Sequence, residues 1–185
     1  VLHEKTNLPA ICGRVCPHEK QCEGHCVLGK KGRPVRIGKL ESFIAQFDSD
    51  MQLTHERIPE KTRGKVAIIG SGPAGLTVAG DLARQGFHVT IFEGQPEAGG
   101  VLMYGIPEYR LPKAVVRNEI KKIEDLGVHF VRNCLVGTPE SGVTVDSLFA
   151  EGFDAIFMGT GTALPQNLSI PGSDLRRVTQ STDFL

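Results

Sequence analysis

The chain has 185 residues and equal numbers of acidic and basic side chains, 21 of each, so its formal net charge at pH 7 is zero. This length accommodates one ordinary domain and a small additional unit, and the balanced charge argues against nucleic-acid binding, which requires excess positive charge. Because 40% of the residues are hydrophobic and no apolar run approaches the roughly 18 residues of a membrane helix, we expect a globular cytoplasmic protein without membrane contact.

Four of the five cysteines lie near the start of the chain in the spacing C-x3-C-P-x5-C-x3-C. They are Cys12, Cys16, Cys22 and Cys26. The pattern favours an iron–sulfur cluster, because a Cys-Pro pair and small residues between the thiolates are typical of ferredoxins. Structural zinc also tolerates such spacings, and disulfides are a third interpretation, although no secretion signal opens the chain.

The surroundings of these cysteines are basic. Residues 1–40 carry eight basic and three acidic side chains, a local net charge of +5, with a basic run at residues 30–36. This run could offset the charge of thiolate-bound clusters, steer an acidic electron-transfer partner, or be a solvated loop. We interpret His18 and His25 as exposed loop residues rather than ligands, since four thiols suffice for a cluster.

An amphipathic helix is predicted over residues 39–51. Its apolar residues recur at helical spacing and should form its buried face: Leu40, Phe43, Ile44, Phe47 and Met51. A polar segment marked by Pro and Gly follows at residues 58–64 and predicts a domain boundary. We therefore expect a small helical cysteine-rich domain over residues 1–60 and a second domain over residues 64–185.

The second domain opens with a β-α-β pattern. A short β-branched run at residues 65–69 predicts a strand buried on both faces, a helix follows at residues 76–85, and a second strand at residues 88–92. Such a unit predicts a parallel sheet with a right-handed crossover, and hence a Rossmann-like α/β fold. Further along, a helix is predicted at residues 112–125 and strands at residues 128–131 and 154–158.

The turn between the first strand and its helix predicts a dinucleotide site. Gly70-Ser71-Gly72-Pro73-Ala74-Gly75 places glycines for a tight turn, for approach to a pyrophosphate and for helix–strand packing. Glu93 ends the second strand 23 positions after Gly70, where it can accept hydrogen bonds from ribose hydroxyls. No basic residue follows it in residues 94–100, which favours FAD or NAD over NADP.

A second glycine-rich segment at residues 99–107 favours FAD, because bare backbone can lie against a long, flat cofactor. Gly161, after the last predicted strand, would add another close approach. We assign no catalytic residue, and the candidate cofactor contacts are Gly70, Ser71, Gly72, Pro73, Ala74, Glu93, Gly100, Leu102, Gly105, Ile106, Val136 and Gly161. Cys134 stands alone in the second domain and is interpreted as a buried apolar residue, which excludes a redox cysteine pair there.

Three motifs together resemble one branch of the flavoprotein pyridine-nucleotide reductases. These motifs are the dinucleotide turn, the segment Gly99–Pro107 and the run Tyr109-Arg110-Leu111-Pro112-Lys113. They are similar to the small (beta) subunit of NADPH-dependent glutamate synthase and its relatives, namely the flavin subunit of ferredoxin-dependent transhydrogenases, sulfide dehydrogenase and the N-terminal part of dihydropyrimidine dehydrogenase. The resemblance implies electron transfer from NADPH through FAD and [4Fe–4S] clusters to a large glutamate synthase-type subunit or a ferredoxin-like partner.

The resemblance also implies a ligand set and a missing part. Two clusters would share interleaved ligands, with Cys16, Cys22 and Glu41 serving one, Cys26 the other, and Cys12 the least defined role. The NADPH site would lie on a segment absent from this chain, so we expect a fragment without NADPH-driven activity of its own. The alternative from another class is a non-catalytic nucleotide- or zinc-binding interaction module.

Overall fold

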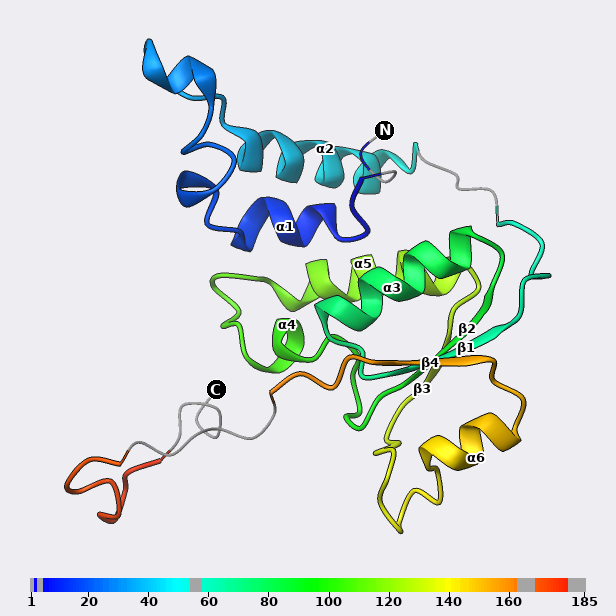
Figure 1. Ribbon diagram of the computed structural model, residues 1–185. Coiled ribbons are helices and arrows are strands. Elements are labelled where there is room, and N and C mark those ends of the chain that lie inside the picture. The colour runs from blue at the N-terminus through cyan, green and yellow to red at the C-terminus, as the bar shows by residue number, and fades with distance from the viewer. Residues whose placement is uncertain (1, 3–4, 54–57, 163–168, 180–185) are drawn as a thin grey trace.

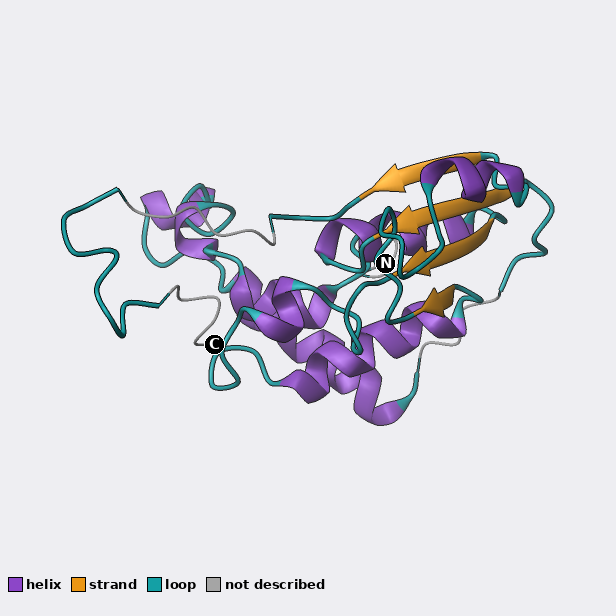
Figure 2. Cartoon of the chain, turned by 90° about the horizontal axis from the view of Figure 1, so that it is seen from below, coloured by secondary structure: helices purple, strands orange, loops and turns teal. Residues whose placement is uncertain are grey.

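The computed structural model describes the chain except residues 1, 3–4, 54–57, 163–168 and 180–185. Its centre is a four-stranded parallel sheet with the strand order β3-β2-β1-β4. The strands are β1 (Lys65–Ile69), β2 (His88–Phe92), β3 (His129–Val131) and β4 (Ala155–Met158). All four point the same way (Figure 2), so their carboxyl ends meet at one edge of the sheet. The predicted parallel α/β fold is confirmed.

Helices cover both faces of this sheet (Figure 1). Helices α3 (Pro73–Arg84) and α5 (Lys113–Asp125) lie on one face, and α6 (Val145–Ala150) lies on the other. Helix α3 begins three residues before the predicted helix, because Pro73 occupies the first helical position, where its missing N–H leaves no bond unmade. A short helix that the sequence pattern did not predict, α4 (Val101–Tyr104), lies within the second glycine-rich segment.

The cysteine-rich part adds two further helical layers above α3 and α5. Helix α1 (Pro9–Val15) lies between α2 (Ile37–Met51) and the helices of the sheet domain (Figure 1). Two short 3-10 turns, His18–Lys20 and Val27–Lys30, connect α1 to α2. None of the helices in the described ranges is long and apolar enough to cross a membrane.

The main hydrophobic core does not stop at the predicted domain boundary. Leu8 and Ile11, at the start of α1, are 4% and 2% exposed and belong to the same buried cluster as the inner side chains of the sheet domain. These partners include Leu76 on α3 and Val116 on α5. A second, smaller cluster lies on the α6 face of the sheet and includes Cys134, as expected for a buried apolar residue.

The predicted orientation of α2 is wrong. The large side chains that were expected to be buried are about half exposed or more, with Phe43 at 66%, and Phe43 stacks on Phe47 of the same helix. The buried residues of α2 are instead Gly38 and Ala45. The reason is a close helix crossing: a Cβ on Gly13 of α1 would lie 2.5 Å from the backbone nitrogen of Ser42. Small residues therefore face α1, and the apolar stripe turns away from it.

Candidate functional site

The dinucleotide turn is built by glycines whose positions are fixed by close backbone contacts. Gly70 has φ +96°, and a Cβ there would lie 2.5 Å from the carbonyl oxygen of Gly159, beyond β4. A Cβ on Gly75 would lie 2.0 Å from the carbonyl oxygen of Gly70, so only glycine allows α3 to start this near β1. Gly72 differs from both, because nothing lies within 4 Å of its Cβ position. The N-terminus of α3 is therefore closely packed behind and open in front.

This open end of α3 suits an anion. Gly72 is the N-cap residue, and no side chain caps the helix. A helix N-terminus without a side-chain cap presents unpaired N–H groups and the positive end of the helix dipole, which together attract phosphate. Helix α3 has 12 residues, enough for an effective dipole. Pro73 and Ala74, which were expected in the turn before the helix, occupy its first turn.

Glu93 lies directly after β2 and is tied to the turn through Ser71. Its Oε2 accepts hydrogen bonds from the Ser71 nitrogen, at 2.9 Å, and from the Ser71 hydroxyl, while its Oε1 accepts one from the Gln95 nitrogen at 2.8 Å. The Ser71 hydroxyl in turn accepts a hydrogen bond from the Gly99 nitrogen at 2.9 Å. Glu93 is 7% exposed and Ser71 is fully buried. One serine therefore joins the turn, the acidic residue and the second glycine-rich segment.

The hydrogen-bond capacity of Glu93 limits what it can add. A carboxylate has about four lone-pair positions, and three are already used by the chain. Oε1 has capacity for one ribose hydroxyl without rearrangement. A second hydroxyl would have to replace the Ser71 hydroxyl on Oε2, leaving that serine to bond elsewhere. The predicted double acceptance by Glu93 therefore involves a side-chain exchange at Ser71.

The two glycine-rich segments touch each other. Gly100 has φ +53°, and its Cβ position is 3.0 Å from the Cα of Gly72. Helix α4 starts directly after Gly100, so its N-terminus and that of α3 lie together at the carboxyl edge of the sheet. The structure thus brings together the predicted residues Gly70, Gly72, Gly100 and Glu93, which come from three separate segments of the chain.

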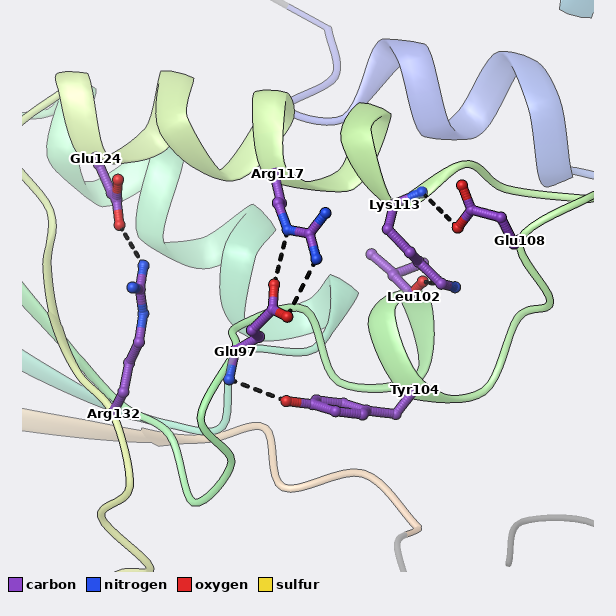
Figure 3. Close-up of polar contacts among 8 residues, drawn as sticks. All are labelled: Glu97, Leu102, Tyr104, Glu108, Lys113, Arg117, Glu124 and Arg132. Carbon is purple, nitrogen blue, oxygen red and sulfur yellow. Dashed lines mark hydrogen bonds and ion pairs between the residues drawn. The ribbon is translucent and has the colours of Figure 1, made fainter. Parts of the chain in front are cut away.

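The segment between β2 and α5 is held by polar contacts that the sequence pattern did not indicate (Figure 3). Glu97 accepts two hydrogen bonds from the Arg117 guanidinium on α5, at 2.8 and 3.1 Å, and this pairing lowers the pKa of the Glu97 carboxyl. The Glu97 nitrogen donates to the Tyr104 hydroxyl at 2.9 Å. A bidentate Arg–carboxylate pair fixes orientation as well as distance. It therefore anchors this loop to α5.

Lys113 holds the other end of α4. Its ammonium donates to the carbonyl of Leu102 at 3.0 Å and to the carbonyl of Ile106, and its backbone nitrogen donates to Glu108 Oε2 at 3.0 Å. These carbonyls lie in and just after α4, where a cation is favoured by the helix dipole. Lys113, from the third sequence motif, therefore holds α4 and the residue after Gly105 against the start of α5 (Figure 3).

The remaining predicted contacts fall into two groups. Leu102 is 4% exposed and packs into the main core together with Ile106, and Val136 packs into the smaller core, so these side chains support the site from inside. Gly161 has φ +67° and open space at its Cβ position. Leu135, which the sequence analysis did not single out, is 62% exposed, and its side chain lies 3.2 Å from the Cβ position of Gly94, the residue after Glu93.

Four of the five cysteines lie in the cysteine-rich part, Cys12 within α1 and Cys16, Cys22 and Cys26 after it, and all four are free thiols. Burial raises the pKa of the Cys12 thiol to about 11, opposed by a hydrogen bond with Thr6 and increased by the nearby Cys16 and Glu41. The Cys26 thiol has a lowered pKa, because backbone N–H groups, led by that of Val35, donate to it. The two ends of the cysteine motif thus have opposite tendencies to ionise.

The described residues supply soft thiol donors but not a closed metal site. Within the ranges that the structure describes, no three His, Cys, Asp or Glu side chains lie close enough together to hold a metal ion. Cys12 lies within electrostatic range of Cys16 and Glu41, whereas Cys22 is exposed. Burial raises the pKa of Glu41, opposed by His18 and increased by Glu119. The chemistry fits iron–sulfur ligation, and the grouping of Cys16, Cys22 and Glu41 on one cluster stays a prediction.

The two histidines of this region differ. His25 is exposed, as expected, and its Nδ1 lies 2.7 Å from the carbonyl oxygen of Gln21. The prediction of an exposed loop residue is wrong for His18, which is half-buried. Its Nε2 is enclosed and has no hydrogen-bond partner among the residues that the structure describes. Its ring lies against Gly38, where a Cβ would be 2.4 Å from the ring. The glycine at the start of α2 makes room for the imidazole.

Two family models match the chain, one for each part. Residues 1–53 match the model described as dihydropyrimidine dehydrogenase domain II, 4Fe-4S cluster. Residues 64–185 match the model described as pyridine nucleotide-disulphide oxidoreductase.

Curated relatives match nearly the whole chain. The glutamate synthase [NADPH] small chain of Bacillus subtilis is 40% identical over 185 residues, covering 100% of this chain and 36% of its own length. The NAD-dependent dihydropyrimidine dehydrogenase subunit PreT of Salmonella typhimurium is 40% identical over 164 residues, or 89% of this chain and 40% of its own. The chain spans between 27% and 40% of the length of curated relatives that it matches.

Among solved structures, Mycobacterium tuberculosis FprA in complex with NADPH is similar, with a TM-score of 0.58 and 26% sequence identity. The match covers 66% of this chain and 28% of the FprA chain.

Proposed function

Because the chain belongs to the pyridine nucleotide-disulphide oxidoreductase family and also matches a 4Fe-4S domain model, we propose that it is the FAD- and iron–sulfur-binding part of an NADPH-dependent oxidoreductase. The proposed electron path runs from NADPH through FAD and [4Fe–4S] clusters to a partner, with a large glutamate synthase-type subunit as the favoured acceptor. Relatives at 38–40% identity that are glutamate synthase small chains support this choice. We place the domain limits at residues 1–60 and 64–185.

The observation that carries the FAD assignment is the open N-terminus of α3 next to the Ser71–Glu93–Gly99 linkage. In the proposed site the first turn of α3 binds the pyrophosphate through backbone N–H groups, and Glu93 accepts from the ribose. Gly100 and Gly161 let backbone approach the cofactor. Bound FAD supplies hydride acceptance and the conversion between two-electron and one-electron transfer. This chain binds and orients it.

No disulfide exchange is assigned to this site, despite the name of the family. Cys134 is the single cysteine in residues 64–185, and it is buried in the smaller core with a pKa raised by burial. A dithiol reaction needs a second thiol near the first. The proposed electron exit therefore leads toward the thiols of the first 53 residues.

The FAD assignment is tested by titrating the 185-residue chain with FAD and measuring flavin fluorescence. We expect Glu93→Ala to weaken binding by about 10- to 100-fold, since a ribose acceptor and the Ser71 contact are both lost. Ser71→Ala separates the two causes, because it frees Oε2 of Glu93 but breaks the link to Gly99. Glu124→Ala is the control, because this half-buried carboxylate on α5 pairs with Arg132. Equal FAD affinity of wild type and Glu93→Ala would contradict the assignment.

The iron–sulfur assignment is tested separately by anaerobic reconstitution with iron and sulfide. We propose Cys12, Cys16, Cys22, Cys26 and Glu41 as the ligands that this chain contributes. Binding of iron with matching inorganic sulfide, and the visible absorbance of thiolate–iron bonds, would support the proposal. A colourless protein that retains stoichiometric zinc would support the zinc-binding module instead.

A further inference from the structure

Helix α1 contains Cys12 and ends directly before Cys16, and no side chain of its own segment caps its N-terminus. Its N-cap residue is Leu8, whose side chain cannot accept a hydrogen bond, and Pro9 follows in the first turn. The acceptor for the free N–H of its first turn comes instead from the sheet domain, 109 residues further along the chain than Ala10. Glu119 on α5 accepts a hydrogen bond from the Ala10 nitrogen on its Oε2 at 3.1 Å. A carboxylate at this position also favours the positive end of the helix.

Glu119 is unusual because it is a fully buried acid. Its exposed fraction is 0%, and its other oxygen, Oε1, forms an ion pair with Lys122 Nζ at 3.1 Å, one turn further along α5. Burying a carboxylate is unfavourable unless partners compensate, and an apolar residue at the same place would be less unfavourable. Buried ionic groups are retained in several systems because they specify geometry rather than stability. A buried acid at the start of α1 therefore points to a fixed orientation of that helix.

Asn7, which lies just before α1, makes a second set of contacts that holds this helix. Asn7 is 6% exposed. Its amide nitrogen donates to the Thr77 carbonyl at 2.8 Å and to Asp81 Oδ1 at 2.7 Å, and its oxygen accepts from the Arg84 guanidinium. All three partners lie on α3. Gly80 allows this approach, because a Cβ there would lie 2.7 Å from the Asn7 oxygen.

The two contacts complement the apolar packing between them. Leu8 and Ile11 pack into the main core, but apolar contacts alone permit a helix to slide or rotate, since they are not directional. Hydrogen bonds to two different helices, α3 and α5, fix both the height and the rotation of α1. Helix α3 also presents its N-terminus to the proposed FAD site, so one rigid element spans the distance between the cofactor and the thiols.

We propose that Glu119 and Asn7 are positioning residues that fix the thiol-bearing helix α1 on the dinucleotide-binding domain. Cys12 and Cys16 are thereby held at a constant distance and orientation relative to the FAD site. The importance of this geometry for electron transfer rests on the proposed function. The attachment of α1 itself does not, and it can be tested in the chain without any cofactor.

The experiment uses NMR of the isotope-labelled 185-residue chain, with residual dipolar couplings that report how α1 is oriented relative to the sheet. Four variants are compared with wild type: Glu119→Ala, Glu119→Gln, Asn7→Ala and, as the control on the same helix, Glu124→Gln. We expect the couplings of residues 10–15 to fall by at least about a third in Glu119→Ala and Asn7→Ala, because α1 then samples several orientations. Couplings of β1 and β2 should keep their wild-type fit.

Glu119→Gln decides between positioning and general stability. Its amide oxygen can still accept from the Ala10 nitrogen, so we expect wild-type couplings for α1 even if the melting temperature falls with the loss of the Lys122 ion pair. Unchanged α1 couplings in both Glu119→Ala and Asn7→Ala would overturn the proposal. If Glu119→Ala does not fold, the couplings of Asn7→Ala alone decide whether the proposal stands. Failure to bind FAD or iron would refute the proposed function and leave these couplings unaffected.

Discussion

The thiols of Cys12 and Cys26 belong to one motif but have opposite environments. Burial raises the pKa of Cys12 to about 11, whereas backbone donors lower that of Cys26. Because the thiolate is the nucleophile, we expect iodoacetamide to alkylate Cys26 before Cys12 at neutral pH in the metal-free chain. The alkylation rate of Cys12 should keep rising as the pH approaches 11. The alkylation rate of Cys26 should reach its plateau at a lower pH than that of an ordinary thiol, because its pKa is lowered. Peptide mass spectrometry over the neutral to alkaline range measures both, and faster labelling of Cys12 at neutral pH would contradict the assignment.

Two glycines of the dinucleotide turn should respond differently to the same methyl group. Gly75→Ala places a Cβ 2.0 Å from the Gly70 carbonyl oxygen, so backbone must shift at a cost of about 1–3 kcal/mol of unfolding free energy. Gly72→Ala meets no atom within 4 Å, and its φ of −64° suits alanine. We expect Gly72→Ala to keep the stability of wild type but to weaken FAD binding, since the methyl group occupies the open front of α3. Urea unfolding and FAD titration of both variants separate the two effects; equal stabilities would refute the packing argument.

Much of this turn was predictable because the contact of Gly75 with Gly70 acts within a few positions, although Gly70 also packs against the distant Gly159. Glu93 was placed correctly at the end of β2 for the same reason. Its use of Ser71, and the bond of Ser71 to Gly99, depend on how two segments 28 residues apart meet. Glu119 is the extreme case, since its partner lies 109 residues away and nothing in its own helix distinguishes it from an exposed acid. Long-range polar partners are decided by tertiary packing and leave no local pattern.

Helix α4 and the residues just after it are held by the side chain of Lys113. The Lys113 ammonium satisfies the carbonyls of Leu102 and Ile106 from a position that is partly buried. Lys113→Met keeps the length of the side chain and removes the donor, so two carbonyls lose a charged partner at about 1–3 kcal/mol. We expect faster proteolysis within residues 105–110 and faster release of FAD. Lys121 is an exposed lysine that lies on α5, as Lys113 does, and pairs with Asp125. Lys121→Met should change neither the proteolysis nor the release of FAD. Wild-type proteolysis of Lys113→Met would contradict the bracing role.

Helix α2 shows where periodicity predicts an element but not its surroundings. The apolar spacing placed the helix within two residues of its observed start, yet the face it predicted as buried is exposed. Periodicity identifies an apolar face, while the closest helix contact is set by the smallest residues, here Gly13 opposite Ser42. The large side chains then cannot face the same neighbour. The sequence of α2 alone does not show whether its apolar face or its small residues will contact the neighbouring helix.

At the scale of the whole molecule, one hydrophobic core contains residues of both predicted domains. The change in composition near residue 60 is real, because cysteines and basic residues lie before it and the glycine-rich strands after it. The packing crosses it, since Leu8 and Ile11 contact the same cluster as α3 and α5. The parallel direction of the sheet was predictable from the β-α-β pattern. The contact across the boundary was not, because α1 is short and its apolar residues show no period of their own.

This shared core predicts that the two parts unfold together. Ile11 is 2% exposed, so Ile11→Ala removes a buried side chain at about 2–5 kcal/mol. If α1 and the sheet form one cooperative unit, that loss lowers the free energy of unfolding of the whole chain. Amide exchange in β1 and β2, far from the substitution, should then become faster. The loss of unfolding free energy calculated from these exchange rates should equal the loss measured by urea unfolding. Leu28→Ala, at a 55% exposed site in the same N-terminal part, is the matched control and should leave both measurements unchanged. Slow, wild-type exchange of the β1 amides in Ile11→Ala would show that the sheet is stable without α1, and that the domain boundary near residue 60 is also a boundary in folding.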